Sequence, residues 1–239
     1  MITEDSGKQV HSSGAQVICL DGPSGVGKGT ICLAVAKKLG WHILDSGSLY
    51  RITALAFSRE FPNANVNSVK ISQITEIIDY LDVCYAVDND CLAIRLGDED
   101  IGEAIRNEAI GALASELAAI PEVRAALLER QRAFAQVPGL VADGRDMGTV
   151  VFPDAVLKIY LTASPEVRAE RRYKQLIDKG IDVNLASLVE ELRLRDERDM
   201  NREVAPLKPA ADAIVVDTSK LDIQQVTHEV MRWVDQRVR

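Results

Sequence analysis

The chain has 239 residues, 47% of them hydrophobic, and a formal net charge of −8 at pH 7. This length suffices for one substantial α/β core with an insertion, while the acidic balance argues against a nucleic-acid partner. The four cysteines are scattered, the three histidines are dispersed and no apolar run approaches a membrane span, so we expect a cytoplasmic protein with no membrane partner and no zinc-type metal site.

Residues 1–14 are polar and contain no apolar run, so we expect a disordered tail. Helical patterns then alternate with short apolar runs that are typical of strands buried on both faces. The expected strands are Val17–Leu20, His42–Leu44, Leu140–Ala142, Val156–Leu161 and Ala213–Val216. Strands that alternate with helices form parallel sheets, so the predicted fold class is α/β, with a doubly wound five-stranded parallel sheet.

A glycine-rich stretch that ends in lysine follows the first expected strand. Its glycines allow positive φ and bring backbone N–H groups against phosphate oxygens, and the next helix points its positive end at the same anion. A glycine-rich turn without a ligand is the alternative, but the lysine favours a P-loop that binds a nucleoside triphosphate. The expected ATP-binding residues are Gly22, Pro23, Ser24, Gly25, Val26, Gly27, Lys28, Gly29 and Thr30.

This motif departs from the general pattern in one position. The hydroxyl that usually follows the lysine and binds Mg²⁺ is displaced, because Gly29 stands there and Thr30 comes next. The variant is similar to that of nucleoside monophosphate kinases, in which phosphates and water hold most of the metal. We therefore expect Mg²⁺ to accompany ATP and assign it no protein ligand.

Polar residues follow the second expected strand, where ligands bind in open α/β sheets. Ser46 begins a helix, and Tyr50 and Arg51 lie one turn later, a set that suits a nucleotide monophosphate. A capped helix with one core tyrosine and one solvated arginine is the competing interpretation.

The stretch 61–120 interrupts the alternation of strands and helices. A helix over Val69–Leu81 precedes two runs, Val83–Val87 and Cys91–Leu96, which Asp88-Asn89-Asp90 joins as a hairpin, with a third short strand near Asp100. We expect an α+β module here, inserted into a core made of residues 15–60 and 121–239.

Asp143, Gly144, Arg145 and Asp146 follow the third core strand. Gly144 permits close approach of a ligand, Arg145 can clamp a phosphate, and Asp143 lies where a Walker B carboxylate would. A surface turn rich in glycine and aspartate is the alternative.

Two arginine-rich segments come later in the chain. Arg168, Arg171 and Arg172 crowd a helix that begins near Ser164, which predicts a mobile lid over about 168–183 or else a plain basic face. Arg195, Arg198, Asp199 and Arg202 share one helix face, which suits either a phosphate site or a solvated ion-pair stripe.

Together these segments resemble the bacterial cytidylate kinases. The resemblance is carried by Leu20–Thr30, Asp45–Gly47 with Tyr50-Arg51, Asp143–Thr149, Glu197–Asp199 with Asn201-Arg202 and the inserted module, and it spans about residue 16 to the C-terminus. It implies transfer of the γ-phosphoryl group of ATP to CMP or dCMP, with the inserted module binding the monophosphate. We expect a monomer whose partners are these small molecules.

The resemblance also implies individual roles. The acceptor would contact Ser46, Arg51, Ser115, Arg124, Arg145, Asp146, Arg195, Asp199 and Arg202. The positions of Tyr50, Asp143 and Gly144 after expected strands add them to the acceptor site, and we expect Lys28, Arg145 and Arg195 to act in catalysis. A GTPase is disfavoured because the sequence has neither an N-K-x-D nor a D-x-x-G motif, and a nucleic-acid-dependent ATPase is disfavoured by the charge. Within the kinases, UMP or another small hydroxylated acceptor remains the alternative.

Overall fold

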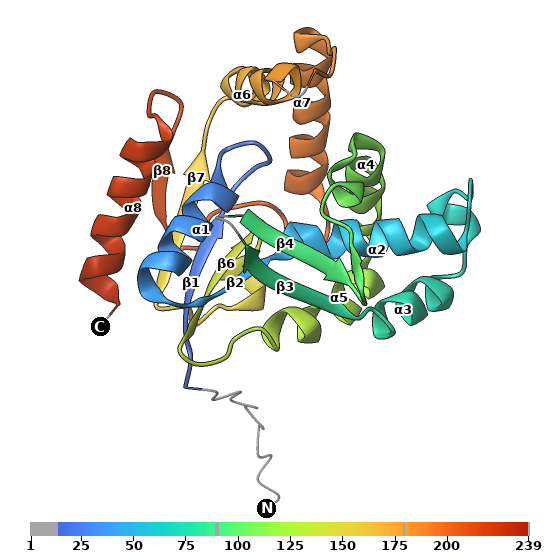
Figure 1. Cartoon of the computed structure of the whole chain (residues 1–239), viewed down its shortest axis with the longest axis horizontal. Coiled ribbons are helices and arrows are strands. Elements are labelled where there is room, and N and C mark those ends of the chain that lie inside the picture. The colour runs from blue at the N-terminus through green and yellow to red at the C-terminus, as the bar shows by residue number, and fades with distance from the viewer. Residues whose placement is uncertain (1–13, 89–90, 179, 239) are drawn as a thin grey trace, which may run out of the picture.

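In the computed structural model, which describes residues 14–88, 91–178 and 180–238, parallel strands form a central sheet. They are β1 (Gln16–Asp21), β2 (His42–Asp45), β6 (Gly139–Gly144), β7 (Leu157–Thr162) and β8 (Ile214–Asp217), in the order β2-β6-β1-β7-β8 (Figure 1). The five predicted core strands and the predicted fold class are confirmed.

The strand β1 is buried on both faces, which shows that the sheet is covered on both sides. Val17 and Cys19 face one apolar cluster, and Ile18 and Leu20 face the other, so both sides of the strand are buried. Such a strand reads as a continuous apolar run, as strands of covered parallel sheets do.

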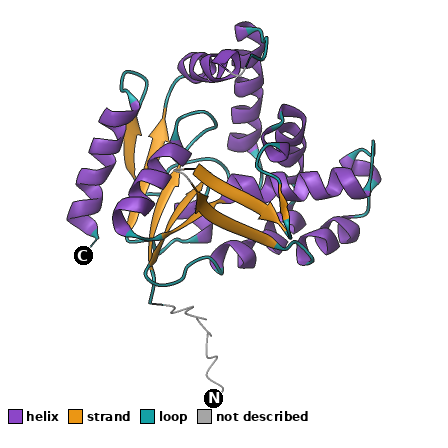
Figure 2. Ribbon diagram, in the orientation of Figure 1, coloured by secondary structure: helices purple, strands orange, loops and turns teal. Residues whose placement is uncertain are grey.

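Helices cover both faces of the sheet (Figure 2). The cluster around Ile18 is closed by α1 (Lys28–Leu39) and α8 (Ile223–Arg237). The opposite cluster is closed by α2 (Ser46–Glu60) and α5 (Pro121–Arg132). A capping box formed by Asp222 and Gln225 begins α8.

The stretch 61–120 is the expected mixture of helices and antiparallel strands. It contains α3 (Ile71–Asp79), β3 (Val83–Asp88), β4 (Cys91–Leu96), β5 (Glu99–Asp100) and α4 (Glu108–Leu117), with short helical turns at Val66–Ser68 and Ala104–Arg106. The helix α3 is shorter than predicted at both ends, and the predicted turn residues 89–90 lie outside the described residues. Apolar side chains of the stretch 61–120 join the apolar cluster that α2 and α5 close.

The helices α6 (Pro165–Asp178) and α7 (Leu185–Asn201) pack against each other at the top of Figure 1. A small apolar cluster of their own, centred on Ala169, Leu176 and Leu188, joins the two helices. The predicted tail falls, except for Gly14, outside the described residues. Within the described ranges, no helix is long and apolar enough to cross a bilayer.

Candidate active site

The carboxyl ends of three neighbouring strands bring the predicted site residues to one edge of the sheet. The strand β1 runs into the glycine-rich loop, β2 ends at Asp45, and β6 ends at Gly144. Ligands of open parallel sheets bind at this edge, so the polar segments after Asp21, Asp45 and Gly144, which lie far apart in the sequence, face the same space.

The glycine-rich loop has the backbone that the sequence predicts. Gly22, Gly25 and Gly27 have φ values of 147°, 78° and 99°, a region that L side chains rarely adopt. At Gly22 a Cβ atom would also lie 2.1 Å from the carbonyl oxygen of Leu161. The loop therefore keeps a shape that only glycine permits, and it ends at the N-terminus of α1, where backbone N–H groups are free to bind an anion.

Lys28 begins α1 and is almost fully enclosed. Its Nζ donates to the carbonyl of Pro23 at 2.9 Å and lies 3.7 Å from the carboxylate of Asp143. Burial is the main cause that lowers the pKa of Lys28, with Arg145 adding to it, and burial likewise raises the pKa of Asp143. A bound phosphate would place a full negative charge next to the buried ammonium group of Lys28.

A cavity of about 730 Å³ opens above the glycine-rich loop. The loop residues from Ser24 to Gly27 and Thr30 line it on one side, and α6 and α7 line it on another through Arg171, Arg172 and Arg195. Arg51 lines a further wall. Its volume is typical of sites for nucleotide-sized ligands.

A second cavity of only about 40 Å³ lies beside the first. Ten of the twelve residues that the sequence assigns to an acceptor line it: Ser46, Tyr50, Ser115, Arg124, Gly144, Arg145, Asp146, Arg195, Asp199 and Arg202. The other two lie apart from it, since Arg51 lines the larger cavity and Asp143 pairs with Lys28.

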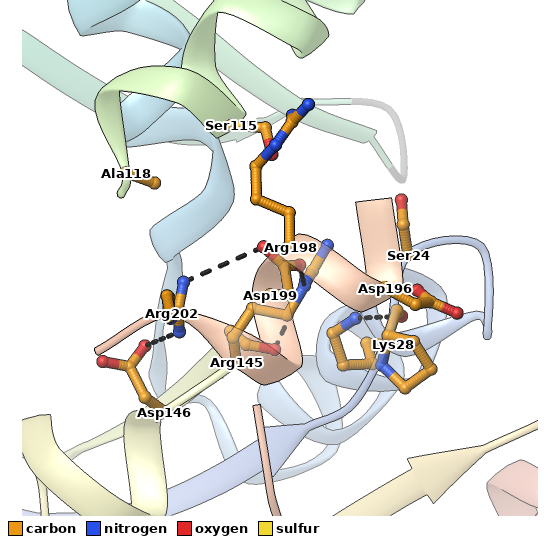
Figure 3. Close-up of polar contacts among 12 residues, drawn as sticks. Ser24, Lys28, Ser115, Ala118, Arg145, Asp146, Asp196, Arg198, Asp199 and Arg202 are labelled. Atoms are coloured by element: carbon orange, nitrogen blue, oxygen red, sulfur yellow. Dashed lines mark hydrogen bonds and ion pairs between the residues drawn. The ribbon is translucent and has the colours of Figure 1, made fainter. Parts of the chain in front are cut away.

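The charged residues of the second cavity pair with one another (Figure 3). Arg124 donates to the Asp146 carboxylate, and the Nε of Arg145 donates to Asp199 at 3.1 Å. Arg202 lies 3.8 Å from Asp146 and 3.9 Å from Asp199. With Arg195, four arginines and two aspartates line this cavity, and the excess of positive charge favours an anionic ligand.

Arg195 connects the two cavities, because its side chain lines both. Its Nε is buried without a hydrogen-bond partner, as is one terminal nitrogen of Arg202. Burial first, and then the nearby Arg145, lower the pKa of Arg195 to about 10. Buried donors without acceptors are costly and rare, so this guanidinium lies where a phosphate oxygen would satisfy it.

The comparisons with known proteins agree with this arrangement. A family profile described as cytidylate kinase matches residues 18–236. The cytidylate kinase of Stutzerimonas stutzeri (strain A1501) is 56% identical over 223 residues, which cover 92% of this chain and 96% of the relative. That of Aeromonas salmonicida (strain A449) is 52% identical over 224 residues, covering 94% and 96%. The chain belongs to the cytidylate kinase family. It is therefore a nucleoside monophosphate kinase.

Several residues around this cytidylate kinase site were not found from the sequence. The Ser46 hydroxyl donates to the buried side chain of Gln131 at 3.1 Å, and the Ser115 hydroxyl accepts from Arg198 at 3.1 Å. The sequence predicts Arg198 on the arginine-bearing helix face but does not predict its contact with Ser115. Gln131 gave no signal, because it lies in a polar stretch of α5 far from Ser46 in sequence.

The three arginines expected in a kinase lid have different surroundings. Arg171 donates to the hydroxyl and carbonyl of Thr218, and Arg172 forms an exposed ion pair with Glu108 of the inserted stretch. Arg168 is only 1% exposed and pairs with Asp196 of α7. Only the first two line the larger cavity.

The residues around the glycine-rich loop also fit the magnesium ion that accompanies ATP. Among the described residues, no group of three or more His, Cys, Asp or Glu side chains could hold a metal by itself. Thr30 lines the large cavity, and the Asp143 carboxylate lies beside Lys28 and Gly29. These oxygens suit contacts to a magnesium ion, or to its water, that the phosphates bring with them.

Proposed function

We propose that this protein transfers the γ-phosphoryl group of ATP to CMP and dCMP. The observation that carries the proposal is Arg195, a buried guanidinium with an unpaired Nε at the junction between the P-loop cavity and the arginine–aspartate cluster. Because Arg195 borders both cavities, we assign to it a contact with the phosphate that moves from donor to acceptor.

The protein's own contribution to this reaction is positioning and charge. The N–H groups of the glycine-rich loop hold the donor phosphates, and Lys28 offsets charge on the moving phosphoryl group. Arg145 and Arg195 bind the acceptor phosphate and hold its oxygen in line with the donor. Magnesium supplies further charge neutralisation when bound with ATP.

The acceptor base is assigned to the second cavity. Asp146 can accept from the N4 amino group of cytosine but would face the O4 acceptor of uracil, while Arg124 can donate to N3 and O2 of cytosine. Asp199 and Arg202 are assigned to the sugar and phosphate. Because about 40 Å³ cannot hold a nucleoside, the internal ion pairs must rearrange when CMP enters.

A coupled assay of ADP release tests this function directly. Equal concentrations of CMP, dCMP, UMP, AMP, GMP and shikimate are supplied with ATP and Mg²⁺. We expect CMP and dCMP to give the highest kcat/KM, with UMP well below them, because the cavity offers a carboxylate acceptor to the amino group. A higher kcat/KM for UMP or shikimate would refute the assignment.

The remaining assignments belong to the same proposal. The stretch 61–120 acts as the acceptor-binding module, and about 168–183 acts as the lid, as the position of Arg171 and Arg172 at the large cavity suggests. The protein works as a monomer in the cytoplasm. The buried free thiols of Cys19 and Cys32 suit a reducing compartment.

A further inference from the structure

Arg168 is among the largest fully buried side chains of the described residues, and each end of its guanidinium has a partner. Its Nε donates to the carbonyl of Ala163 at 3.0 Å, and one Nη donates to the carbonyl of Ser24, also at 3.0 Å. Both Nη atoms donate to the carboxylate of Asp196. A bidentate pair of this kind fixes orientation as well as distance.

These contacts join three parts of the site. Ser24 belongs to the P-loop, Arg168 to α6 and Asp196 to α7. Figure 3 shows Ser24 and Asp196 on the same side of the site. The P-loop also packs closely here, since a Cβ atom on Gly25 would lie 3.4 Å from the Cβ of Arg168. The phosphate cradle and α7 thus meet through one rigid side chain.

The helix α7 carries residues assigned to the acceptor nucleotide on either side of Asp196. Arg195 precedes it directly, and Asp199 follows one turn later. Leu188 of α7 and Leu176 of α6 belong to one apolar cluster, to which Val183 of the connecting segment also belongs. Apolar packing holds α7 to α6, and the Arg168–Asp196 pair adds a polar contact between the same helices. Because Arg168 also donates to the carbonyl of Ser24, this pair, unlike the apolar packing, connects α7 to the P-loop through Arg168.

We propose that Asp196, acting through Arg168, is a positioning residue that fixes the position of α7 relative to the P-loop. This inference rests on the proposed function: with α7 held in this position, the acceptor phosphate stays in line with the donor phosphate. Small misplacements of reacting groups are costly, of the order of a hundredfold per ångström. Neither residue contacts substrate in this proposal, so substrate affinity depends little on the pair.

The alternative is a buried ion pair that serves stability alone. Breaking such a pair leaves an unpaired buried charge and costs roughly 3–5 kcal/mol, whatever its role. A loss of stability therefore does not separate the two interpretations. A split between kcat and KM does, because stability alone moves neither constant when rates are expressed per folded site.

The chain offers a matched control between the same two helices. Glu166 of α6 accepts from Arg193 of α7 at 2.5 Å, and both side chains are 52% exposed. This pair links α6 to α7 but reaches neither the P-loop nor a cavity-lining residue that the proposal uses. Glu166→Gln is therefore expected to leave the kinetics unchanged.

The experiment compares wild type, Asp196→Asn and Glu166→Gln in the ADP-release assay with CMP, with kcat expressed per CMP-binding site counted by calorimetry. We expect Asp196→Asn to lower kcat by roughly tenfold or more while KM for ATP and for CMP changes less than about threefold. Arg168→Lys, which keeps the charge but loses the bidentate geometry, should behave in the same way and replaces Asp196→Asn if that variant does not fold.

Three results would overturn the inference: an unchanged kcat, a rise in KM without loss of kcat, or an equal loss in Glu166→Gln. Failure of the proposed function is distinguishable, because then the wild-type protein itself would not phosphorylate CMP.

Discussion

Asp146 holds Arg124 and Arg202 with the same carboxylate that is assigned to the cytosine amino group. Asp146→Ala should lower kcat/KM for CMP by roughly ten- to a hundredfold, as for loss of a hydrogen bond to a charged group. The loss with UMP should be smaller, so the preference between the bases narrows. The ratio of the two kcat/KM values is the measurement, since it does not depend on the folded fraction.

A ratio that does not depend on the folded fraction is needed because Asp146→Ala leaves two buried arginines, Arg124 and Arg202, without their carboxylate partner. An equal loss for CMP and UMP would mean that Asp146 only supports the cavity and that the base is read elsewhere.

Lys28 is the residue most directly tied to the donor phosphates. Lys28→Ala should lower kcat by roughly a hundredfold or more, because one strong contact to the transferring group is lost. Lys38 of the same helix is a suitable control, since its pair with Asp235 is exposed. Lys38→Ala should keep wild-type kinetics, and a folded Lys28→Ala enzyme with near-normal kcat would refute the role.

Asp21, the last residue of β1, gives a prediction about pH. Its carboxylate accepts from the backbone N–H groups of Met147 and Gly148 at 2.8 Å each. Burial nevertheless raises its pKa from 3.8 to about 6. The folded chain then binds the proton more tightly than the unfolded chain, so the contribution of Asp21 to stability falls as pH rises from about 4 to about 6.

Asp21→Asn removes this titration. The free energy of unfolding of both proteins is measured in urea at several pH values. As pH rises across that range, the free energy of unfolding of the wild type should fall by up to roughly 3 kcal/mol relative to that of Asp21→Asn. A difference that stays constant with pH would contradict the assignment.

At the scale of elements, α4 packs closely on α2 through a glycine. A Cβ atom on Gly111 would lie 2.8 Å from the Nη2 of Arg51, whose Nη1 donates to the carbonyl of Ile105 at 2.7 Å. Alanine favours a helix over glycine by about 1 kcal/mol, so Gly111→Ala should keep or raise the melting temperature. It should still displace Arg51, which the sequence assigns to the acceptor and which lines the larger cavity, and so raise KM for CMP by roughly tenfold.

Glu116→Ala, on the exposed side of the same helix, is the control for Gly111→Ala. Unchanged KM for CMP in Gly111→Ala would remove Arg51 from the acceptor site.

The elements themselves could be predicted because their signals are local. Buried strands such as β1 read as apolar runs, and the capping box at Asp222 is visible within four residues. The partners of the helical arginines could not, because a stretch that contains Arg168, Arg171 and Arg172 gives no sign of which one turns inward. Arg168 is buried by contacts with Ser24 and Asp196, which lie far from it in sequence.

The candidate site shows the same division. The carboxyl-end rule for parallel strands predicts that the segments after β1, β2 and β6 meet. Ser115 and Arg124 were implied only by family resemblance, since no local pattern marks them. Gln131, which accepts from Ser46, was missed for the same reason.

At the scale of the whole molecule, the two cavities imply movement during the reaction. The acceptor cavity is about 40 Å³, and the helices above the P-loop are bridged to the inserted stretch by the exposed Arg172–Glu108 pair. Exposed pairs contribute little, so this bridge does not prevent opening. Small-angle scattering should show a smaller radius of gyration when a bisubstrate analogue saturates the protein, and an unchanged radius at saturation would count against lid closure.

The central claim is that donor and acceptor sites act as one unit that meets at Arg195. The most direct test measures ADP release by one preparation with ATP alone and with ATP plus CMP. Because the arginine–aspartate cluster must take up the acceptor before the phosphate has a fixed target, we predict release with CMP at least about a hundredfold faster than with ATP alone. Equal rates with and without CMP would contradict the account.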